Sequence, residues 1–323
     1  MTMTKNRHHN PSEETFELAA KILKQGDIVS FPTETVYGLG ADARNSDAVA
    51  KIYEAKKRPQ FNPLIVHLAD ADDAAQYVMM NVYSRKLAKA FWPGPFTMVL
   101  PLKEKSGLSD LVTAGLDTVA IRVPENQTAH ELLTEFDGPI AAPSANKSGN
   151  VSPTTADHVE SEFGPELTMI IDGGPCHKGI ESTILQIDGG EITLLRPGNI
   201  TAEQIEKVIK RDIEVQSSPK NNPTAPGQLK SHYAPKTKMR LNVTDPEPGE
   251  AFLAFGKYKT DKNSLNLSPS GDLVEAAKNL FSMMRTLDKL GLKNIAVAPI
   301  PLTGLGFAIN DRLERAAAPR GET

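Results

Sequence analysis

IVSFPTETVYGLG, residues 28–40, decides the fold class of this chain. The run 28–31 is apolar enough to form a buried strand, and the polar, glycine-containing stretch 32–40 follows it as a turn. Residues 47–56 then have the spacing of a helix, as does the amphipathic stretch 12–26 that precedes the strand. Helix, strand, turn and helix in this order predict a mixed α/β chain and exclude an all-α fold.

The alternation continues along the chain. Further strands are predicted at 64–68, 96–102, 119–123, 140–142, 169–171, 182–187 and 192–195. Further helices are predicted at 82–91, 128–133, 155–163 and 201–210, where Thr201 and Gln204 have the spacing of a capping box.

A segment rich in proline, glycine, serine and asparagine then interrupts the periodicity between 215 and 238. Beyond it, strands at 251–255 and 295–298 flank a helix at 272–290, and a last helix follows at 309–318. We therefore expect a larger α/β domain over 1–211, a linker over 212–238 and a small α/β domain over 239–323.

Composition excludes several classes of protein. A chain of 323 residues with 39% hydrophobic and 24% charged residues is typical of a globular protein of about two domains. The net charge of −4 gives no overall attraction to nucleic acid. The single cysteine, Cys176, cannot form an internal disulfide, and no apolar run reaches the ~18 residues of a membrane span. A cytoplasmic protein without membrane contact is expected.

Familiar nucleotide and metal signatures are missing or weak in the sequence. It contains no GxxxxGK[ST] motif of a P-loop. Residues 38–43 fit GxGxxA, but polar and bulky residues separate them from the preceding strand, unlike a dinucleotide-binding turn. Residues 144–147 fit SxxK without the companion motifs of serine–lysine enzymes. The histidines lack metal-ligand spacing, so no protein-built metal site is expected.

Polar clusters in apolar surroundings indicate an anionic ligand instead. Arg122 lies within the apolar run 119–123, where a guanidinium is costly unless an anion meets it. The loop 142–149 follows a short strand with small residues, hydroxyls and backbone donors that can reach a ligand. Ser182 and Arg196 add a hydroxyl and a second arginine at strand ends.

Other candidates have simpler structural interpretations. Lys56 and Arg58 close a helix, where the helix dipole also favours basic residues. His67 lies inside an apolar strand, and its spacing alone favours a core histidine.

In this order, the motifs resemble the YrdC-type threonylcarbamoyl-AMP synthases, in the long form with a C-terminal extension domain. The motifs that carry the resemblance are PTETVYGLG at 32–40, KxR at 56–58, NPL at 62–64, WPGPFT at 92–97, RVP at 122–124, PSANxSG at 143–149, EST at 181–183 and LRPG at 195–198. APG at 225–227, SHYAP at 231–235, GLG at 304–306 and NDRL at 310–313 are similar to the long form. The resemblance covers nearly the whole chain.

The resemblance implies a twisted mixed sheet with a concave active-site face, followed by a small Rossmann-like domain. It implies a nucleotidyltransferase that makes threonylcarbamoyl-AMP and pyrophosphate from L-threonine, bicarbonate and ATP, for a tRNA threonylcarbamoyltransferase. Threonine would be held by Thr35, His67, Arg122, Ala142 and Ser182. The nucleotide would be held by Arg58, Asn62, Thr118, Ser144, Ser152 and Arg196. Lys56, Arg58, Ser144 and Asn146 would form the catalytic set.

The chemistry of that reaction fits these residue types. Three small reactants must be aligned, and Lys56, Arg58 and Arg196 can neutralise the triphosphate and the leaving pyrophosphate. Mg²⁺ would arrive with ATP and bind phosphate oxygens and water, so no carboxylate cage is needed. No general base is evident.

Two other functions remain open from the sequence alone. The first is a binding module without catalysis, in which Lys51, Lys56, Lys57 and Arg58 contact the phosphates of double-stranded RNA or tRNA. The second is a carbamoyl-phosphate-using or hydrolytic enzyme on the same fold.

The linker also invites a functional interpretation. In the long-form family the matching segment lies over the active-site opening, so Tyr233 is expected to close on the bound nucleotide and protect the reactive product. The alternative is a tether whose tyrosine only packs on the first domain.

Overall fold

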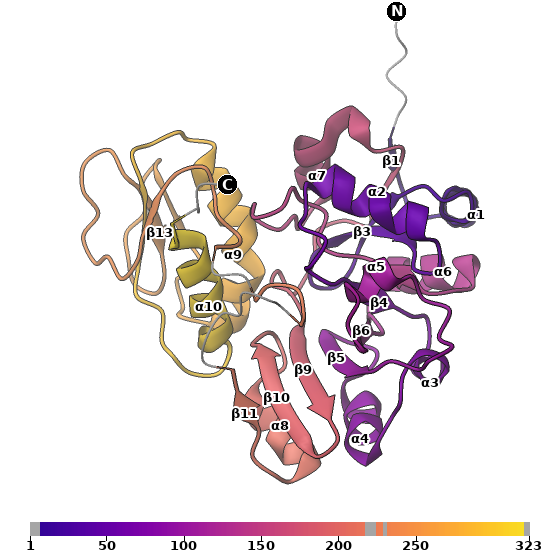
Figure 1. Ribbon diagram of the computed structural model, residues 1–323. Coiled ribbons are helices and arrows are strands. Elements are labelled where there is room, and N and C mark those ends of the chain that lie inside the picture. Colours follow the sequence, from indigo (N-terminus) through magenta and orange to yellow (C-terminus); the bar gives the residue numbers. More distant parts are fainter. Residues whose placement is uncertain (1–6, 217–223, 229–230, 320–323) are drawn as a thin grey trace, which may run out of the picture.

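The computed structural model describes residues 7–216, 224–228 and 231–319. They form a larger first domain and a smaller C-terminal domain packed against it (Figure 1). A mixed sheet runs through the first domain in the order β1-β8-β2-β3-β7-β4-β6-β5-β9-β10-β11. Its strands are β1 His8–His9, β2 Val29–Pro32, β3 Tyr37–Asp42, β4 Ile65–His67, β5 Phe96–Pro101, β6 Thr118–Arg122, β7 Ile140–Ala141, β8 Ile170–Ile171, β9 Thr183–Asp188, β10 Glu191–Arg196 and β11 Glu214–Val215. The mixed α/β sheet predicted from the sequence is confirmed.

The helices of the first domain begin mostly at side-chain caps. They are α1 Glu13–Lys24, α2 Ser46–Lys56, α3 Ala74–Tyr77, α4 Val82–Phe91, α5 Asp110–Thr113, α6 Gln127–Phe136, α7 Ala156–Phe163 and α8 Ala202–Ile209, with a 3-10 turn at Gly164–Glu166. The capping box of Thr201 and Gln204 is present at the start of α8. None of the helices in the described part of the chain has the length and apolar character to cross a membrane.

Residues 32–40 form part of a β-hairpin, whereas the sequence predicted a turn that leads into a helix. β2 pairs with β3 in antiparallel fashion, with Phe31 opposite Gly38. The prediction missed β3 because glycines interrupt its apolar pattern. The packing requires Gly40, since a Cβ there would lie 2.7 Å from Cε1 of Phe31 and 2.8 Å from Cγ2 of Ile140.

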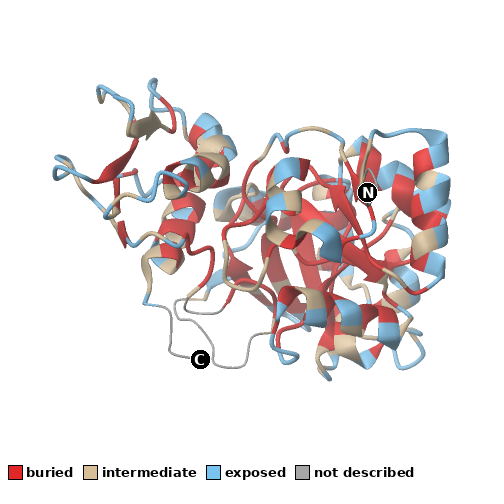
Figure 2. Ribbon diagram, turned by 90° about the horizontal axis from the view of Figure 1, so that it is seen from above, coloured by how far each residue is buried: buried red, intermediate tan, exposed pale blue. Residues whose placement is uncertain are grey.

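The two faces of the sheet are covered differently. Helices α2, α4, α7 and α8 pack on one face, and α1 and α6 cover the β2 and β7 region on the other. In the centre, that second face carries only a small apolar cluster of Ile65, Val99, Ala120, Ile184 and Leu195, together with Ala225 of the segment after β11. Figure 2 shows the buried strands inside the larger lobe and exposed positions along its outer helices.

The C-terminal domain is a small α/β unit, as predicted. Its strands, β12 Met239–Arg240, β13 Ala251–Ala254, β14 Ser264–Asn266 and β15 Ile295–Val297, pair in parallel in the order β12-β15-β13-β14. Its helices are α9 Leu273–Asp288 and α10 Leu305–Ala317. Strand β11 falls inside the predicted linker 212–238, and residues 217–223 and 229–230 of that linker lie outside the described residues.

The two domains share one hydrophobic cluster. Val36, Val151 and Ile180 of the first domain belong to the cluster that contains Phe281 of α9. A Cβ at Gly179 would collide with the backbone of α9, so only glycine allows this close approach. The edge of the first domain near residues 149–152 and 179–181 is therefore held against α9 and α10.

Candidate active site

The face of the central strands without helices forms the floor of a pocket. β4 pairs in parallel with β6, with His67 opposite Arg122, and β5 pairs antiparallel to β6, with Thr97 opposite Arg122. Residues opposite one another in a ladder point to the same face, so these side chains form one row across the strands. The strand neighbours of these residues, such as Val66 before His67 and Ile121 before Arg122, point to the other face and belong to the helix-covered core.

The turn between β2 and β3 adds hydroxyls and a carboxylate at one end of this row. Thr33 Oγ1 lies 2.8 Å from Thr35 Oγ1 and donates to the Val36 carbonyl at 2.7 Å. Glu34 is fully buried, and its Oε1 lies 2.5 Å from Nη2 of Arg122. Its other carboxylate oxygen has no hydrogen-bond partner in the described part of the chain. The sequence predicts a ligand as the anion that meets Arg122, whereas the structure also provides a carboxylate from the chain itself.

Lys56 stabilises the loop that follows β7 by hydrogen bonds to its backbone. It is 1% exposed, and its Nζ donates to the carbonyls of Ser144 at 2.6 Å and Asn146 at 2.5 Å. The Asn146 amide donates to the carbonyls of Lys147 and Asn150. Burial lowers the pKa of Lys56 well below its usual value. Lys56 and Asn146 thus shape the loop that presents Ser144 to the pocket.

Arg58 reaches the pocket from the segment after α2. Its Nε donates to the Asn62 carbonyl at 3.1 Å and its Nη2 to the Pro63 carbonyl at 3.0 Å. Burial lowers the pKa of Arg58 to about 10, so the guanidinium remains charged at neutral pH. Both polar atoms of the Asn62 side chain are buried without a partner among the described residues.

Arg196 closes the pocket at the end of β10. Its guanidinium donates to the Ser182 carbonyl at 2.9 Å and to Ser182 Oγ at 3.1 Å. It also donates to the Pro226 carbonyl at 3.3 Å, which ties the segment 224–228 to the pocket wall. Burial lowers the pKa of Arg196 from its usual value. Ser182 Oγ in turn lies 2.8 Å from Thr97 Oγ1, so the hydroxyls continue the row on the floor.

His67 is a neutral imidazole in this pocket. Burial, and then the positive charge of Arg122, lower the pKa of His67 to about 3. Its Nδ1 is buried without a partner in the part of the chain that is described. At physiological pH the ring can therefore hydrogen-bond a ligand without adding charge.

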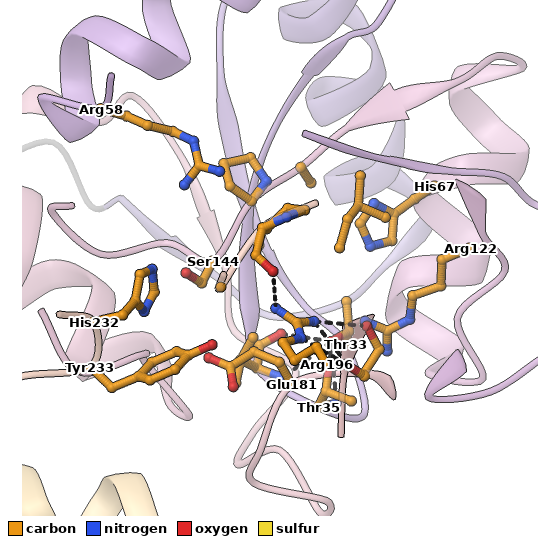
Figure 3. A pocket seen from close by; sticks show the side chains of 18 residues that line it. Thr33, Thr35, Arg58, His67, Arg122, Ser144, Glu181, Arg196, His232 and Tyr233 are labelled. Carbon is orange, nitrogen blue, oxygen red and sulfur yellow. Dashed lines mark hydrogen bonds between the residues drawn. The ribbon is translucent and has the colours of Figure 1, made fainter. Parts of the chain in front are cut away.

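His232 and Tyr233 lie across the pocket from His67 and Arg122 (Figure 3). Their rings are in edge contact with centroids 4.0 Å apart, and Tyr233 stacks on Phe281 of α9 with centroids 5.4 Å apart. Tyr233 is 0% exposed, and its hydroxyl has no partner among the residues described. Pro226 and Gly227 line the same side, so the segment between the domains covers the pocket.

Most of the site residues expected from the sequence come together here. Those that line the pocket are Thr35, Arg58, His67, Arg122, Ala142, Ser144, Ser182, Arg196 and Tyr233. Lys56, Asn62, Asn146 and Ser152 are buried outside this lining. Thr118 is not brought to the pocket: it lies opposite Pro101 at the other end of β6 from Arg122, about 13 Å away at ~3.3 Å per strand residue.

The pocket also contains residues that the sequence analysis did not select. They are Thr33, Val36, Gly38, Ile65, Pro143, Glu181, Pro226, Gly227 and His232. Glu181 directly precedes Ser182, and its Oε1 accepts from Ser152 Oγ at 2.5 Å. Glu34 lies behind Arg122. The place of Glu181 next to the selected Ser182 is a signal that could have identified it, whereas Glu34 pairs with Arg122 across 88 residues and has no such signal.

Comparison with known families adds to this geometry. Residues 21–198 match the Sua5/YciO/YrdC family model, whose description is telomere recombination. Residues 200–318 match the model described as threonylcarbamoyl-AMP synthase, C-terminal domain. The chain belongs to the Sua5/YciO/YrdC family. The resemblance inferred from the sequence motifs is thereby confirmed.

Relatives in this family share nearly the full length of the chain. The threonylcarbamoyl-AMP synthase of Bacillus subtilis is 42% identical over 94% of this chain and 92% of its own. That of Pyrococcus abyssi is 38% identical over 99% of each chain. The crystal structure of P. abyssi Sua5 complexed with L-threonine superposes with a TM-score of 0.89, at 36% identity and 96% coverage of both chains.

Proposed function

We propose that this chain is a threonylcarbamoyl-AMP synthase, a nucleotidyltransferase that forms threonylcarbamoyl-AMP and pyrophosphate from L-threonine, bicarbonate and ATP. The observation that carries the proposal is a single pocket with two chemically different ends. On one side, Arg122 and the neutral His67 form a small polar recess; on the other, Arg58 supplies positive charge; Arg196, bonded to Ser182, lies between them (Figure 3). The names of the full-length relatives, and the threonine complex of one of them, support the same reaction.

The threonine end fits an amino acid by chemistry. A substrate carboxylate would bind the guanidinium of Arg122, which also bonds Glu34 and the Gly94 carbonyl. The neutral His67 and the hydroxyls of Thr35 and Ser182 would orient the side chain and the amine, and Ala142 would leave room for them. The amine attacks bicarbonate to give a carbamate and water, and a carbamate oxygen then attacks the α-phosphorus of ATP as the bond to pyrophosphate breaks.

The nucleotide end fits a triphosphate. Arg58, Arg196 and Ser144 line it, and the unpartnered amide of Asn62 and the hydroxyl of Ser152 lie buried outside the lining. Mg²⁺ belongs here to the substrate, as MgATP. Within the described residues no group of His, Cys, Asp and Glu side chains could hold a metal, and both oxygens of Glu181 are engaged by Ser152 and Arg312. Phosphate oxygens and water therefore suit the ion better than protein ligands.

The RNA-binding alternative is not supported by the positions of its residues. Lys56 is 1% exposed and Arg58 is 7% exposed, so neither offers a surface contact to a phosphate backbone. Lys51 and Lys57 are exposed, but two lysines on a chain of net charge −4 make a weak patch.

We place the product in the cytosol, where a tRNA threonylcarbamoyltransferase would consume it.

The decisive assay is pyrophosphate release from ATP with one substrate omitted at a time. We expect release to require both threonine and bicarbonate, because together they make the nucleophile. Mass spectrometry should detect threonylcarbamoyl-AMP in the complete mixture. Threonine-independent release of phosphate and ADP would overturn the proposal and favour a hydrolytic enzyme on this fold.

We also propose that the linker acts as a lid over the nucleotide, between a catalytic domain at 1–211 and the domain at 239–323. Pro226, Gly227, His232 and Tyr233 line the pocket, and the Tyr233 hydroxyl is buried without a partner in the described part of the chain. A hydroxyl so placed can bond a nucleotide, and its ring can exclude water from the mixed anhydride.

The lid predicts different results for two substitutions of Tyr233. Tyr233→Ala should release threonylcarbamoyl-AMP faster and increase its hydrolysis, whereas Tyr233→Phe should keep the ring's effect and lose only the hydroxyl bond, worth about 0.5–1.5 kcal/mol. Rapid filtration of the enzyme–product complex measures both. Point substitutions are preferred to truncation after Arg211, which would also expose Val36, Val151 and Ile180. Unchanged product retention in a folded Tyr233→Ala enzyme would leave the segment as a tether.

A further inference from the structure

The C-terminal domain delivers a buried arginine to the wall of the pocket. Arg312 lies on α10 and is 0% exposed. Its Nε donates to Oε2 of Glu181 at 3.0 Å. Its Nη1 donates to the Pro197 carbonyl at 2.8 Å and to Asp311 at 2.7 Å. Arg312 therefore connects the small domain to both ends of the 181–197 region, which bears Ser182 and Arg196.

The groups that Arg312 contacts belong to the pocket. Glu181 lines it and also accepts from Ser152 Oγ. The guanidinium carbon of Arg312 lies 5.4 Å from the centroid of the Tyr233 ring, at the distance of a cation–π contact. Tyr233 lines the pocket as well, and its ring also stacks on Phe281. One cation from the second domain thus touches a carboxylate and an aromatic ring of the pocket wall.

The charge of Glu181 makes this contact consequential. A carboxylate in a buried wall repels a polyphosphate, and water screens that repulsion poorly there. Arg312 pairs with the Glu181 carboxylate directly, whereas the nearby Arg196 donates its hydrogen bonds to Ser182 and to the Pro226 carbonyl. Without Arg312, Glu181 would keep the hydrogen bond from Ser152 but lose its ion pair, and Tyr233 would lose its contact with the guanidinium.

We propose that Arg312 is a positioning residue through which the C-terminal domain sets the ATP affinity of the pocket. It neutralises Glu181 and packs against Tyr233, and it acts through these two residues because it does not line the pocket itself. This inference rests on the proposed function, since it presumes that the pocket binds ATP. It assigns the second domain a part in nucleotide binding.

The test uses the full chain and compares Arg312→Met, Glu181→Gln and the double variant. Arg312→Met is expected to raise the KM for ATP by ~10- to 150-fold, while the KM for threonine stays within about twofold. The double variant should recover most of the ATP affinity, because the carboxylate that needs neutralising is gone. Binding of a non-hydrolysable ATP analogue by calorimetry gives the same comparison without turnover.

Arg285→Met is the matched control: it also removes an arginine that joins the two domains, and so measures the effect of a weaker interface alone. Arg285 lies on α9 and bonds Glu162 and the backbone carbonyls of Val151 and Ser152 across the same interface, without touching Glu181 or Tyr233. We expect it to lower the melting temperature without separating the two KM values, and Glu181→Gln should not relieve it. If Arg312→Met does not fold, Arg312→Lys, which keeps the charge but loses the forked hydrogen bonds, carries the same comparison.

Two outcomes would overturn the proposal. One is an equal rise of both KM values in a folded Arg312 variant, and the other is a double variant that binds the ATP analogue no better than the single one. Either result would make Arg312 a domain-docking residue only. Failure of the proposed function looks different: the wild-type chain would then make no threonylcarbamoyl-AMP, whatever the Arg312 variants bind.

Discussion

Arg122→Ala should raise the KM for threonine by ~10- to 150-fold and leave the KM for ATP within about twofold, because a charge-assisted hydrogen bond to the amino-acid carboxylate is worth ~1.5–3 kcal/mol. Steady-state pyrophosphate release with each substrate varied in turn measures both constants. We expect this selectivity because Arg122 lies in one row with His67 and Thr97 on the pocket floor, where the amino acid is proposed to bind.

The same substitution should also destabilise the fold, and a second variant separates the two effects. Glu34 is fully buried and its ion-pair partner is Arg122, so removal of Arg122 leaves a buried charge at a cost of about 3–5 kcal/mol in the free energy of unfolding. In the Arg122→Ala, Glu34→Gln double variant, urea denaturation should show most of that stability restored, while threonine use stays weak. Equal losses for ATP and threonine in this folded double variant would make Arg122 a structural residue.

Arg196→Met should weaken ATP use more than threonine use. The substitution removes a pocket cation whose hydrogen bond to a phosphate contributes ~1.5–3 kcal/mol, and it also frees the Pro226 carbonyl of the covering segment. We expect the KM for ATP to rise by ~10- to 150-fold and kcat to fall with it. Calorimetric titration with an ATP analogue checks the binding part.

Arg211→Met is a suitable control for Arg196→Met. Arg211 lies in the same domain, donates to the Gly190 carbonyl at the surface and packs over Tyr83, away from the pocket. It should leave both KM values unchanged. An Arg196→Met enzyme that matches this control would remove Arg196 from the nucleotide site.

Periodicity predicted the elements whose apolar side chains follow one face that packs on the core. Helix α4 has the predicted bounds, and α1, α8 and β5 differ from theirs by only a few residues. Strand β3 was missed because Gly38 and Gly40 are there for close packing against Ala142, Phe31 and Ile140, which no local pattern reveals. Short strands such as β12 and β14 depend on pairing with distant strands and carry little signal of their own.

The candidate site could be predicted only in part, for a similar reason. Polar residues in apolar strands, such as Arg122 and His67, stand out in a sequence because burial of such groups requires an explanation. Lys56 was assigned to the catalytic set only by the resemblance, and in the structure it supports the loop that bears Ser144. Glu34 and Arg312 are buried partners of other charges, and pairings across 88 and 131 residues cannot be inferred from spacing.

The strict alternation along the central strands makes neighbouring positions subject to different rules of substitution. In β6, Ile121 packs in the helix-covered core, so apolar residues of similar volume should be tolerated there. Arg122, the next residue, faces the pocket, where volume matters less than the ability to meet a carboxylate. The same holds for Val66 and His67 in β4 and for Met98 and Thr97 in β5. A shift of one residue in the register of any of these strands would exchange the two sets, so the precision of strand pairing is itself a determinant of ligand specificity.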